Sequence, residues 1–284
     1  MLTLSNSHLT VSILDPVADV VRLGSRYCTG GYIWQIDDSR RGPLLAGRSY
    51  PDPHPSPFDG QGAPEAFVTP LGRDDCPVGE TVAVIGVGEV RRTGTNSPFH
   101  VRDNPEVARF CRWEIEAGPQ IIRMATDQQA PGCDIRLART VELDGRTVVS
   151  RTELVNRSKA SLPIRWFAHP FFPLNRDRRC FRPVFPLSVP ENPGYIFSDG
   201  GTLFMREEYV WKQGLFQQVD IPSGVMFAAE IFHPLLPSVN VTADYPLESL
   251  PVWANDRTFS PEPYLAVNVS PGGRYEWKIQ YCFG

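Results

Sequence analysis

The pattern of hydrophobic and polar positions along this chain predicts short β-strands almost everywhere. Alternating or β-branched apolar runs follow one another, and Gly, Pro, Asn and Asp separate them. No segment of about ten residues or more shows the 3.6-residue period of an amphipathic helix. Residues 106–110 are expected to form a turn of helix at most. The runs expected to be strands are 9–14, 17–23, 32–36, 81–87, 110–117, 120–125, 134–143, 147–155, 202–205, 215–219, 225–231, 239–242, 250–253, 265–269 and 275–283.

This series of strands predicts an all-β fold. About twenty short strands at spacings of roughly 8–12 residues are typical of a large antiparallel β-sandwich or barrel. Asp144-Gly145, between two β-rich runs, is a strong hairpin signal. No internal repeat of about 20–50 residues is visible, and no linker divides the chain. We therefore expect one domain over residues 1–284, with very little helix. Residues 41–70, rich in proline and glycine, form the one long irregular stretch, of a length that is usually functional or disordered.

Charge and cysteine usage narrow the classes of function. The 28 basic and 32 acidic residues give a net charge of −4, so we expect no nucleic-acid partner. No apolar run is long enough to cross a membrane, and the first residues lack the pattern of a secretory signal. The six cysteines form no CxxC pair, which favours reduced thiols in a cytoplasmic protein. The five histidines show no ligand spacing, so no metal site is expected.

Two residues stand out as candidates for acid–base chemistry. His169 ends the apolar, aromatic run 162–173, and a positioned histidine is a natural proton donor or acceptor. Glu262 lies between Pro261 and Pro263, which stiffen the backbone on both sides. Each also has a structural interpretation, as a packed core histidine and as a solvated loop acid. Together they make an acid–base pair if their environments hold them in different protonation states.

The segments around these two residues resemble those of a known family. Leu-Val-Asn-Arg-Ser at 154–158, followed by the run 162–172 that ends in His-Pro-Phe-Phe, resembles the L-x-N strand and the histidine segment of the aldose 1-epimerase (galactose mutarotase-like) superfamily. The Pro-Glu-Pro at 261–263, followed by Pro-Gly-Gly at 271–273 and Tyr-Glu-Trp at 275–277, is similar to its C-terminal part. The resemblance covers most of the chain, and its specific motifs are those of the histidine and the glutamate.

The resemblance implies a fold and a reaction. The fold is a single large sandwich, a supersandwich, with the sugar in a concave cleft. Glu262 would remove the proton of the anomeric hydroxyl, and His169 would protonate the ring oxygen. The ring would open to the aldehyde, the C1–C2 bond would rotate, and the ring would reclose as either anomer. No cofactor is implied. We expect the two side chains to face one cleft, with room for a pyranose ring between them.

The chain departs from this family in its early part. The family's second histidine lies in an LHGG-like segment that is absent from residues 41–70, where His54 and Glu65 are the alternatives. For the family's early arginine the alternatives are Arg26 and Arg73, and Asp220 is a weak match to its substrate-binding aspartate. An aromatic wall for stacking on a sugar would come from Trp166, Phe171, Phe172, Trp211, Trp253 and Tyr264. The predicted substrate-binding residues are thus Arg26, Glu65, Arg73 and Trp253.

We therefore expect a mutarotase that acts on an aldose or an aldose phosphate. The basic cluster 176–179 would suit a phosphorylated hexose. The alternative is a carbohydrate-binding protein on the same fold without catalysis, which would keep the aromatic wall but would not need the acid–base pair. A glycoside hydrolase normally needs two positioned carboxylates, and only one acid is well framed here. The identity of the sugar and the oligomeric state stay open.

Overall fold

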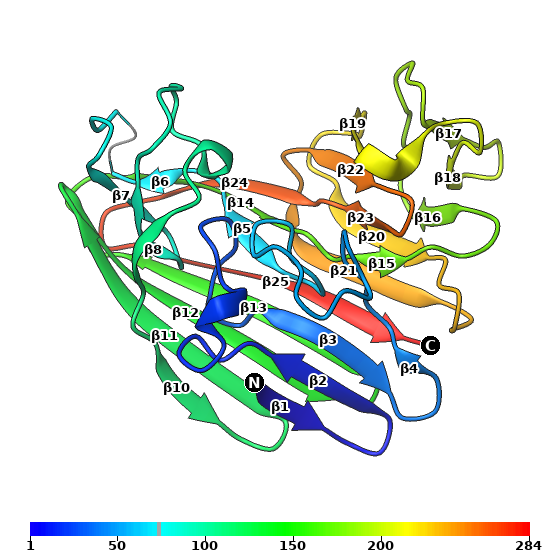
Figure 1. The fold of residues 1–284 in the computed structure, drawn as a ribbon, viewed down its shortest axis with the longest axis horizontal. Helices are drawn as coiled ribbons and strands as arrows, with labels where there is room; N and C mark the ends of the chain where they lie inside the picture. Colours follow the sequence, from blue (N-terminus) through cyan, green and yellow to red (C-terminus); the bar gives the residue numbers. More distant parts are fainter. Residues whose placement is uncertain (73–74) are drawn as a thin grey trace.

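Antiparallel strands form nearly all the regular structure of this computed structural model, which describes residues 1–72 and 75–284. The largest sheet has ten strands, and Figure 1 shows its long members, from green β11 to red β25, side by side. In spatial order they are β10 (Glu114–Ala117), β11 (Ile121–Ala130), β12 (Cys133–Asp144), β13 (Thr147–Asn156), β25 (Arg274–Phe283), β21 (Val239–Pro246), β20 (Met226–Ile231), β16 (Arg179–Pro183), β18 (Leu203–Met205) and β17 (Tyr195–Phe197).

Four smaller sheets and three short 3₁₀ helices complete the described structure. The first sheet contains β1 (Leu2–Ser5), β2 (Leu9–Ile13), β3 (Ile33–Asp38) and β4 (Gly42–Pro43). The second contains β24 (Tyr264–Val269), β14 (Leu162–Ala168) and β5 (Glu65–Phe67). The third contains β15 (Phe172–Pro173), β23 (Thr258–Pro261), β22 (Leu250–Ala254) and β19 (Leu215–Val219). The fourth contains β6 (Pro70–Leu71), β7 (Thr81–Val84), β8 (Gly88–Arg91) and β9 (Val107–Phe110), and the helices are η1 (Val20–Arg22), η2 (Val101–Asp103) and η3 (Trp211–Gln213).

The core lies between these layers because the long strands bury alternate residues. Every second residue of β13 is buried and the residues between are half-buried, and β21 alternates buried with exposed positions. Successive side chains of a strand point to opposite faces, so this pattern gives the large sheet one apolar face. One cluster of buried side chains takes members from all five sheets, among them Leu4, Leu71, Ile164, Phe259 and Ile279. The expected all-β sandwich with very little helix is confirmed.

The hairpin predicted at Asp144-Gly145 joins β12 and β13. Asp144 pairs with Thr147, so Gly145 and Arg146 form a two-residue loop. Gly145 has φ of +54°, the left-handed region that glycine adopts at little cost. Two other expectations are wrong: residues 17–23 contain η1 in place of a strand, and residues 106–110 contain β9 in place of a helical turn.

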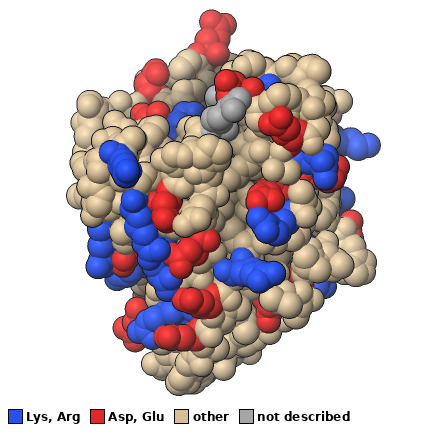
Figure 2. All heavy atoms as spheres, turned by 90° about the vertical axis from the view of Figure 1, so that its left-hand side faces the viewer, with Lys and Arg blue, Asp and Glu red and all other residues tan. Residues whose placement is uncertain are grey.

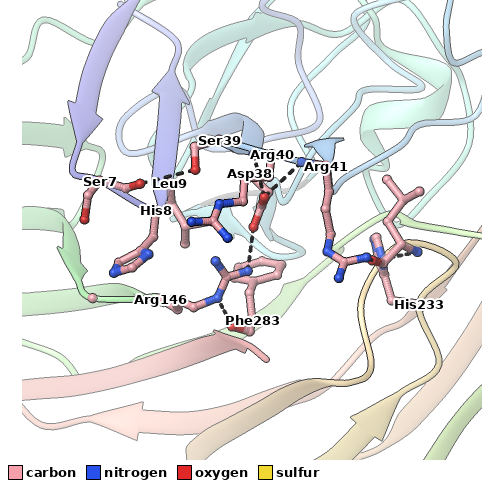
Figure 3. Close-up of polar contacts among 12 residues, drawn as sticks. Ser7, His8, Leu9, Asp38, Ser39, Arg40, Arg41, Arg146, His233 and Phe283 are labelled. Atoms are coloured by element: carbon pink, nitrogen blue, oxygen red, sulfur yellow. Dashed lines mark hydrogen bonds and ion pairs between the residues drawn. The ribbon is translucent and has the colours of Figure 1, made fainter.

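Asp38 and Arg146 fasten the first sheet to the end of the large sheet (Figure 3). Arg146 donates hydrogen bonds to Asp38 Oδ2 at 2.6 Å and to the Phe283 carbonyl at 2.7 Å. The other oxygen of Asp38 accepts the backbone N–H groups of Arg40 and Arg41. These contacts hold the carboxylate charged, and the pKa of Asp38 lies below its usual value although burial alone would raise it.

Acidic and basic side chains are intermixed on the face shown in Figure 2. Some of these side chains form ion pairs between neighbouring strands. Arg136 of β12, for example, lies 2.9 Å from Asp127 of β11. Exposed pairs of this type contribute about 0–1 kcal/mol each to stability, so they shape the surface more than they hold the fold. None of the helices in residues 1–72 and 75–284 is long and apolar enough to cross a membrane.

Candidate active site

A cavity of about 400 Å³ lies where the strand ends of two small sheets meet two loops. Its inner wall comes from residues at the ends of β5, β14, β22 and β24, and its mouth from residues 58–59 and 100–102. Both residues of the predicted acid–base pair line it, as do Arg26 and Trp253. The sequence motifs around His169 and Glu262, which are 93 positions apart in the chain (262 − 169), therefore meet in one site.

The backbone after β14 holds His169 in place. The His169 N–H donates to the Pro64 carbonyl at 2.8 Å, and the Phe171 N–H donates to the Gly62 carbonyl at 2.8 Å. The Phe171 ring stacks on the imidazole with 4.3 Å between ring centroids. Nδ1 is buried and has no hydrogen-bond partner among the described residues. Nε2 is therefore the nitrogen available for proton exchange.

Glu262 occupies the corner between β23 and β24. Its N–H donates to the Pro251 carbonyl at 2.8 Å, and the next residue but one, Tyr264, donates its N–H to the Ser249 carbonyl at 3.0 Å. The prolines at 261 and 263 restrict the backbone around the glutamate. This corner fixes the direction of the carboxylate, which is almost completely buried.

The two side chains touch. Nε2 of His169 lies 3.3 Å from Oε1 of Glu262, and the side chains are 2% and 4% exposed. The expectation of a pyranose ring between them is therefore wrong, because no ring fits into a gap of this size. The groups instead lie side by side and share the lining of one cavity. The anomeric hydroxyl and the ring oxygen of a sugar are bonded to the same carbon, so neighbouring groups can face both oxygens at once.

Burial sets the protonation of the pair. It raises the pKa of Glu262 to about 8, although the positive charge of Arg26 and the hydroxyl of Tyr264 act in the opposite direction. Burial also lowers the pKa of His169 well below its usual value, and Arg26 lowers it further. Both shifts favour uncharged groups. Burial therefore favours a protonated carboxyl beside a neutral imidazole over the charged forms.

Arg26 lies beside the pair, and its guanidinium packs against two aromatic rings. Its guanidinium carbon is 4.8 Å from the ring centroid of Tyr27 and 4.9 Å from that of Phe58. It donates a hydrogen bond to the Phe58 carbonyl at 3.3 Å. Trp253 is half-buried on β22, and its ring centroid lies 6.1 Å from that of His169.

The structure does not bring every predicted binding residue to the cavity. Glu65 faces the core, where its carboxylate lies 2.5 Å from a guanidinium nitrogen of Arg139 and accepts the Ser150 hydroxyl at 2.5 Å. Arg73 lies outside the described residues. His54 and Asp220 are exposed and, like the basic cluster 176–179, are not part of the cavity lining.

Four polar residues of the cavity were not identified from the sequence as binding residues. They are Arg48, Asp59, His100 and Arg102. Arg48 and Asp59 lie in the irregular stretch 41–70, whose length was the only signal for them. His100 and Arg102 belong to the segment around η2, where no motif marks them. Their contribution depends on how distant loops meet, which a local pattern does not encode.

Among the described residues no group of three or more potential metal ligands comes together. His233, which is buried like His169, contacts the Leu44 carbonyl at 2.9 Å through Nε2 and accepts the Leu235 N–H at 3.1 Å through Nδ1. It therefore closes a loop against the end of the first sheet.

Solved structures that are similar to this chain over its whole length share one fold. A galactose mutarotase related enzyme from Lactobacillus acidophilus matches with a TM-score of 0.61 and 12% identity, over 99% of this chain and 96% of that one. A galactose mutarotase-like protein from Lactobacillus casei matches with a TM-score of 0.59 and 12% identity, over 100% of both chains. An aldose epimerase homologue from C. elegans matches with a TM-score of 0.53 and 11% identity, over 100% of this chain and 98% of that one.

No protein-family model matches the sequence, and no curated protein matches it. The structural matches nevertheless span the whole chain, and they agree with the resemblance found at the histidine and glutamate motifs. This chain therefore has the fold of the galactose mutarotase-like, aldose 1-epimerase superfamily.

Proposed function

We propose that this protein interconverts the α and β anomers of an aldose or an aldose phosphate. The observation that carries the proposal is the contact between His169 and Glu262, two almost completely buried titratable groups that line one cavity. The cavity volume of about 400 Å³ lies within the range of about 300–1,000 Å³ that is usual for small-molecule sites. Perturbed titratable groups in such a cavity are typical of a catalytic site.

The reaction needs one proton acceptor and one donor. The Glu262 carboxylate takes the proton of the anomeric hydroxyl, and the His169 imidazolium gives a proton to the ring oxygen. The bond between the anomeric carbon and the ring oxygen breaks, and the hydroxyl oxygen becomes the aldehyde oxygen. After rotation about the C1–C2 bond the same proton transfers run backwards and close the ring as either anomer. Positioned acid–base groups typically supply about 10²–10⁴-fold acceleration.

The pair carries the same number of protons throughout. The charged form has a carboxylate and an imidazolium, and one proton transfer over the 3.3 Å contact converts it to a carboxyl and a neutral imidazole. The uncharged form is also the one that the pair holds while the sugar is open. Because burial favours this form, the cavity stabilises the protonation state of the open-chain intermediate. No cofactor is needed for these steps.

Anomer exchange measured by NMR saturation transfer, with polarimetry as a second method, tests the proposal on a panel of aldoses and aldose phosphates. His169→Gln and Glu262→Gln should each slow the exchange by at least about 100-fold. Glu248→Gln is the matched control, because this partly exposed glutamate pairs with Arg165 outside the cavity lining. Circular dichroism establishes that each variant is folded. Full activity of both site variants would refute the acid–base assignment.

The second candidate is a carbohydrate-binding protein without catalysis. The aromatic rings of Trp253 and Phe216 on the cavity lining favour it, since they offer faces on which a sugar can stack. It predicts sugar binding by calorimetry with no acceleration of anomer exchange for any sugar on the panel. The buried acid–base pair does not favour this candidate over the mutarotase, because sugar binding alone requires no proton exchange.

Two further proposals concern the chain as a whole. One buried cluster takes members from all five sheets, which supports a single domain over residues 1–284. All six cysteines are free thiols, which supports a cytoplasmic location. Limited proteolysis tests the single domain, because a two-domain chain would release a stable fragment. Fractionation of the source cells tests the cytoplasmic location.

A further inference from the structure

The charges on the cavity lining are unbalanced. Three arginines line the cavity, namely Arg26, Arg48 and Arg102, against two acids, Asp59 and Glu262. Glu262 contacts His169 at 3.3 Å and forms no ion pair with an arginine of the described lining, and burial, which raises its pKa to about 8, favours its uncharged form. Asp59 forms an ion pair with Arg48 at 2.9 Å. Two of the three positive charges on the described lining therefore have no negative partner there.

The arginines occupy two different depths. Arg26 lies near the pair, because its guanidinium carbon is 4.8 Å from the ring centroid of Tyr27, which is itself 6.1 Å from that of His169. Its charge lowers the pKa of both His169 and Glu262. The guanidinium carbon of Arg48 lies 6.0 Å from the ring centroid of Trp253, which also lines the cavity. Arg26 and Arg48 are both half-buried, whereas Arg102 is exposed, as expected for a residue at the mouth. Arg102 forms no ion pair with any of the described residues.

The mouth is also held in shape. The Phe58 carbonyl accepts a hydrogen bond from Arg26, the Asp59 carbonyl accepts the Tyr27 hydroxyl at 3.3 Å, and the Asp59 carboxylate holds Arg48. On the other side, His100 Nδ1 accepts the Arg102 N–H at 3.1 Å. The proton of neutral His100 is therefore on Nε2, and this histidine of the cavity lining presents a donor. A mouth of guanidinium and N–H donors suits a group that only accepts hydrogen bonds.

We propose that the substrate is an aldose with an anionic group remote from the anomeric carbon, a phosphate or a carboxylate, which Arg102 binds at the cavity mouth while Arg48 neutralises Asp59. This inference rests on the proposed function for the orientation of the sugar, with its anomeric carbon at His169 and Glu262. The basic cluster 176–179 is not the anion site. It lies outside the cavity lining, and the guanidinium carbon of Arg179 lies 3.6 Å from the centroid of the Phe232 ring.

The test compares kcat/KM for anomer exchange of a neutral aldose, its 6-phosphate, the corresponding uronate and an amino sugar. The two anionic sugars should exceed the neutral sugar by at least about 10-fold, and the amino sugar should be the poorest. Arg102→Gln should lower the ratio of anionic to neutral kcat/KM by about 10-fold. Added salt should lower this ratio as well, because it screens the exposed guanidinium. A preference between phosphate and uronate identifies the anion.

Arg176→Gln is the matched control, because it removes the same charge from an exposed position in the cluster 176–179. The ratio of anionic to neutral kcat/KM in Arg176→Gln should equal that of the wild type. If this ratio fell in Arg176→Gln and not in Arg102→Gln, the assignment would be overturned. Arg48→Lys, which keeps the charge opposite Asp59, should lower the ratio less than Arg48→Gln does.

Failure of this inference differs from failure of the proposed function. Equal turnover of neutral and anionic sugars, with a ratio unchanged in Arg102→Gln, overturns the anion site and leaves the mutarotase. Absence of acceleration for every sugar overturns the mutarotase. In that case calorimetry with the 6-phosphate decides: binding that weakens in Arg102→Gln supports the anion site, and absence of binding overturns it.

Discussion

Glu65 and Arg139 form an ion pair in the core directly behind the candidate active site. The guanidinium nitrogen of Arg139 lies 2.5 Å from the Glu65 carboxylate, and both side chains are at most 3% exposed. Arg139 comes from β12 of the large sheet, and Glu65 begins β5. The residue before it, Pro64, accepts the N–H of His169. The ion pair therefore ties the strand that supports His169 to the large sheet.

Breaking this pair should destabilise the protein strongly. Arg139→Met leaves a buried carboxylate without its partner, which should lower the free energy of unfolding by about 3–5 kcal/mol in urea denaturation. The double variant Glu65→Gln with Arg139→Met should recover part of this loss, because no buried charge remains. Glu106→Gln, which breaks the exposed pair with Arg91, is the control and should cost less than about 1 kcal/mol. If Arg139→Met and Glu106→Gln lowered the free energy of unfolding equally, the buried pair would not be what holds the layers together.

The rate of anomer exchange should show a bell-shaped dependence on pH, and its acidic limb should lie at unusually low pH. Activity requires the pair to hold one shared proton, which it loses as the pH rises through about 8, the pKa of Glu262. It gains a second proton only well below pH 6.5, because the pKa of His169 is lowered. In Arg26→Gln both limbs should move to higher pH, since this positive charge lowers both pKa values. Limbs that stay in place in this variant would contradict the position of Arg26 beside the pair.

Glu262 should make the protein less stable as the pH rises. Its folded-state pKa of about 8 lies above its usual value of 4.5. Between these values the folded protein holds a proton that the unfolded chain has released, so stability falls with rising pH. Glu262→Gln should therefore gain stability over the wild type by a few kcal/mol between pH 5 and about 8, as measured by denaturant unfolding. A difference that does not vary with pH over this window would exclude the raised pKa.

Trp253 should contribute to sugar binding more than to the chemical step. Trp253→Ala removes an aromatic face from the cavity lining, so KM should rise about 5–10-fold while kcat changes less than about 3-fold. Phe216, which lines the same cavity and is 54% exposed, should show a smaller effect of the same kind. Ile196→Ala removes an exposed apolar side chain outside the cavity lining and should leave both constants unchanged. A fall in kcat alone for Trp253→Ala would assign this ring to the positioning of the acid–base pair.

The two members of the proposed acid–base pair could be singled out from the sequence because each lies in a distinctive local segment. His169 follows an apolar strand, and Glu262 lies between two prolines, so both positions are marked without reference to distant residues. The contact between them could not be predicted, because it depends on how the ends of β14 and β23 meet. Asn156, in the L-x-N motif, has a structural role: its amide donates to the carbonyls of Ala160 and Val269.

The failed predictions have local physical causes. Residues 17–23 contain β-branched valines, yet Val17 and Val21 are both 78% exposed. The Asp15 side chain accepts the N–H groups of Val17 and Ala18, and such contacts compete with strand formation. Glu65 lies at the right place in the chain for a site residue, but its side chain points into the core to Arg139. An acidic side chain on a short strand can face either layer, and only the packing decides.

The cavity is assembled from two kinds of backbone with different freedom to change. The acid–base pair is held at strand ends by ladder-like hydrogen bonds, whereas the mouth comes from the loops around residues 58–59 and 100–102. Loops of this kind accept substitution and insertion more readily than the strands they connect. Under the proposed function, substrate preference can therefore diverge by exchange of mouth residues while the acid–base pair stays the same. Grafting a different loop at 100–102 onto this scaffold is accordingly the most direct route to a variant with a new sugar preference.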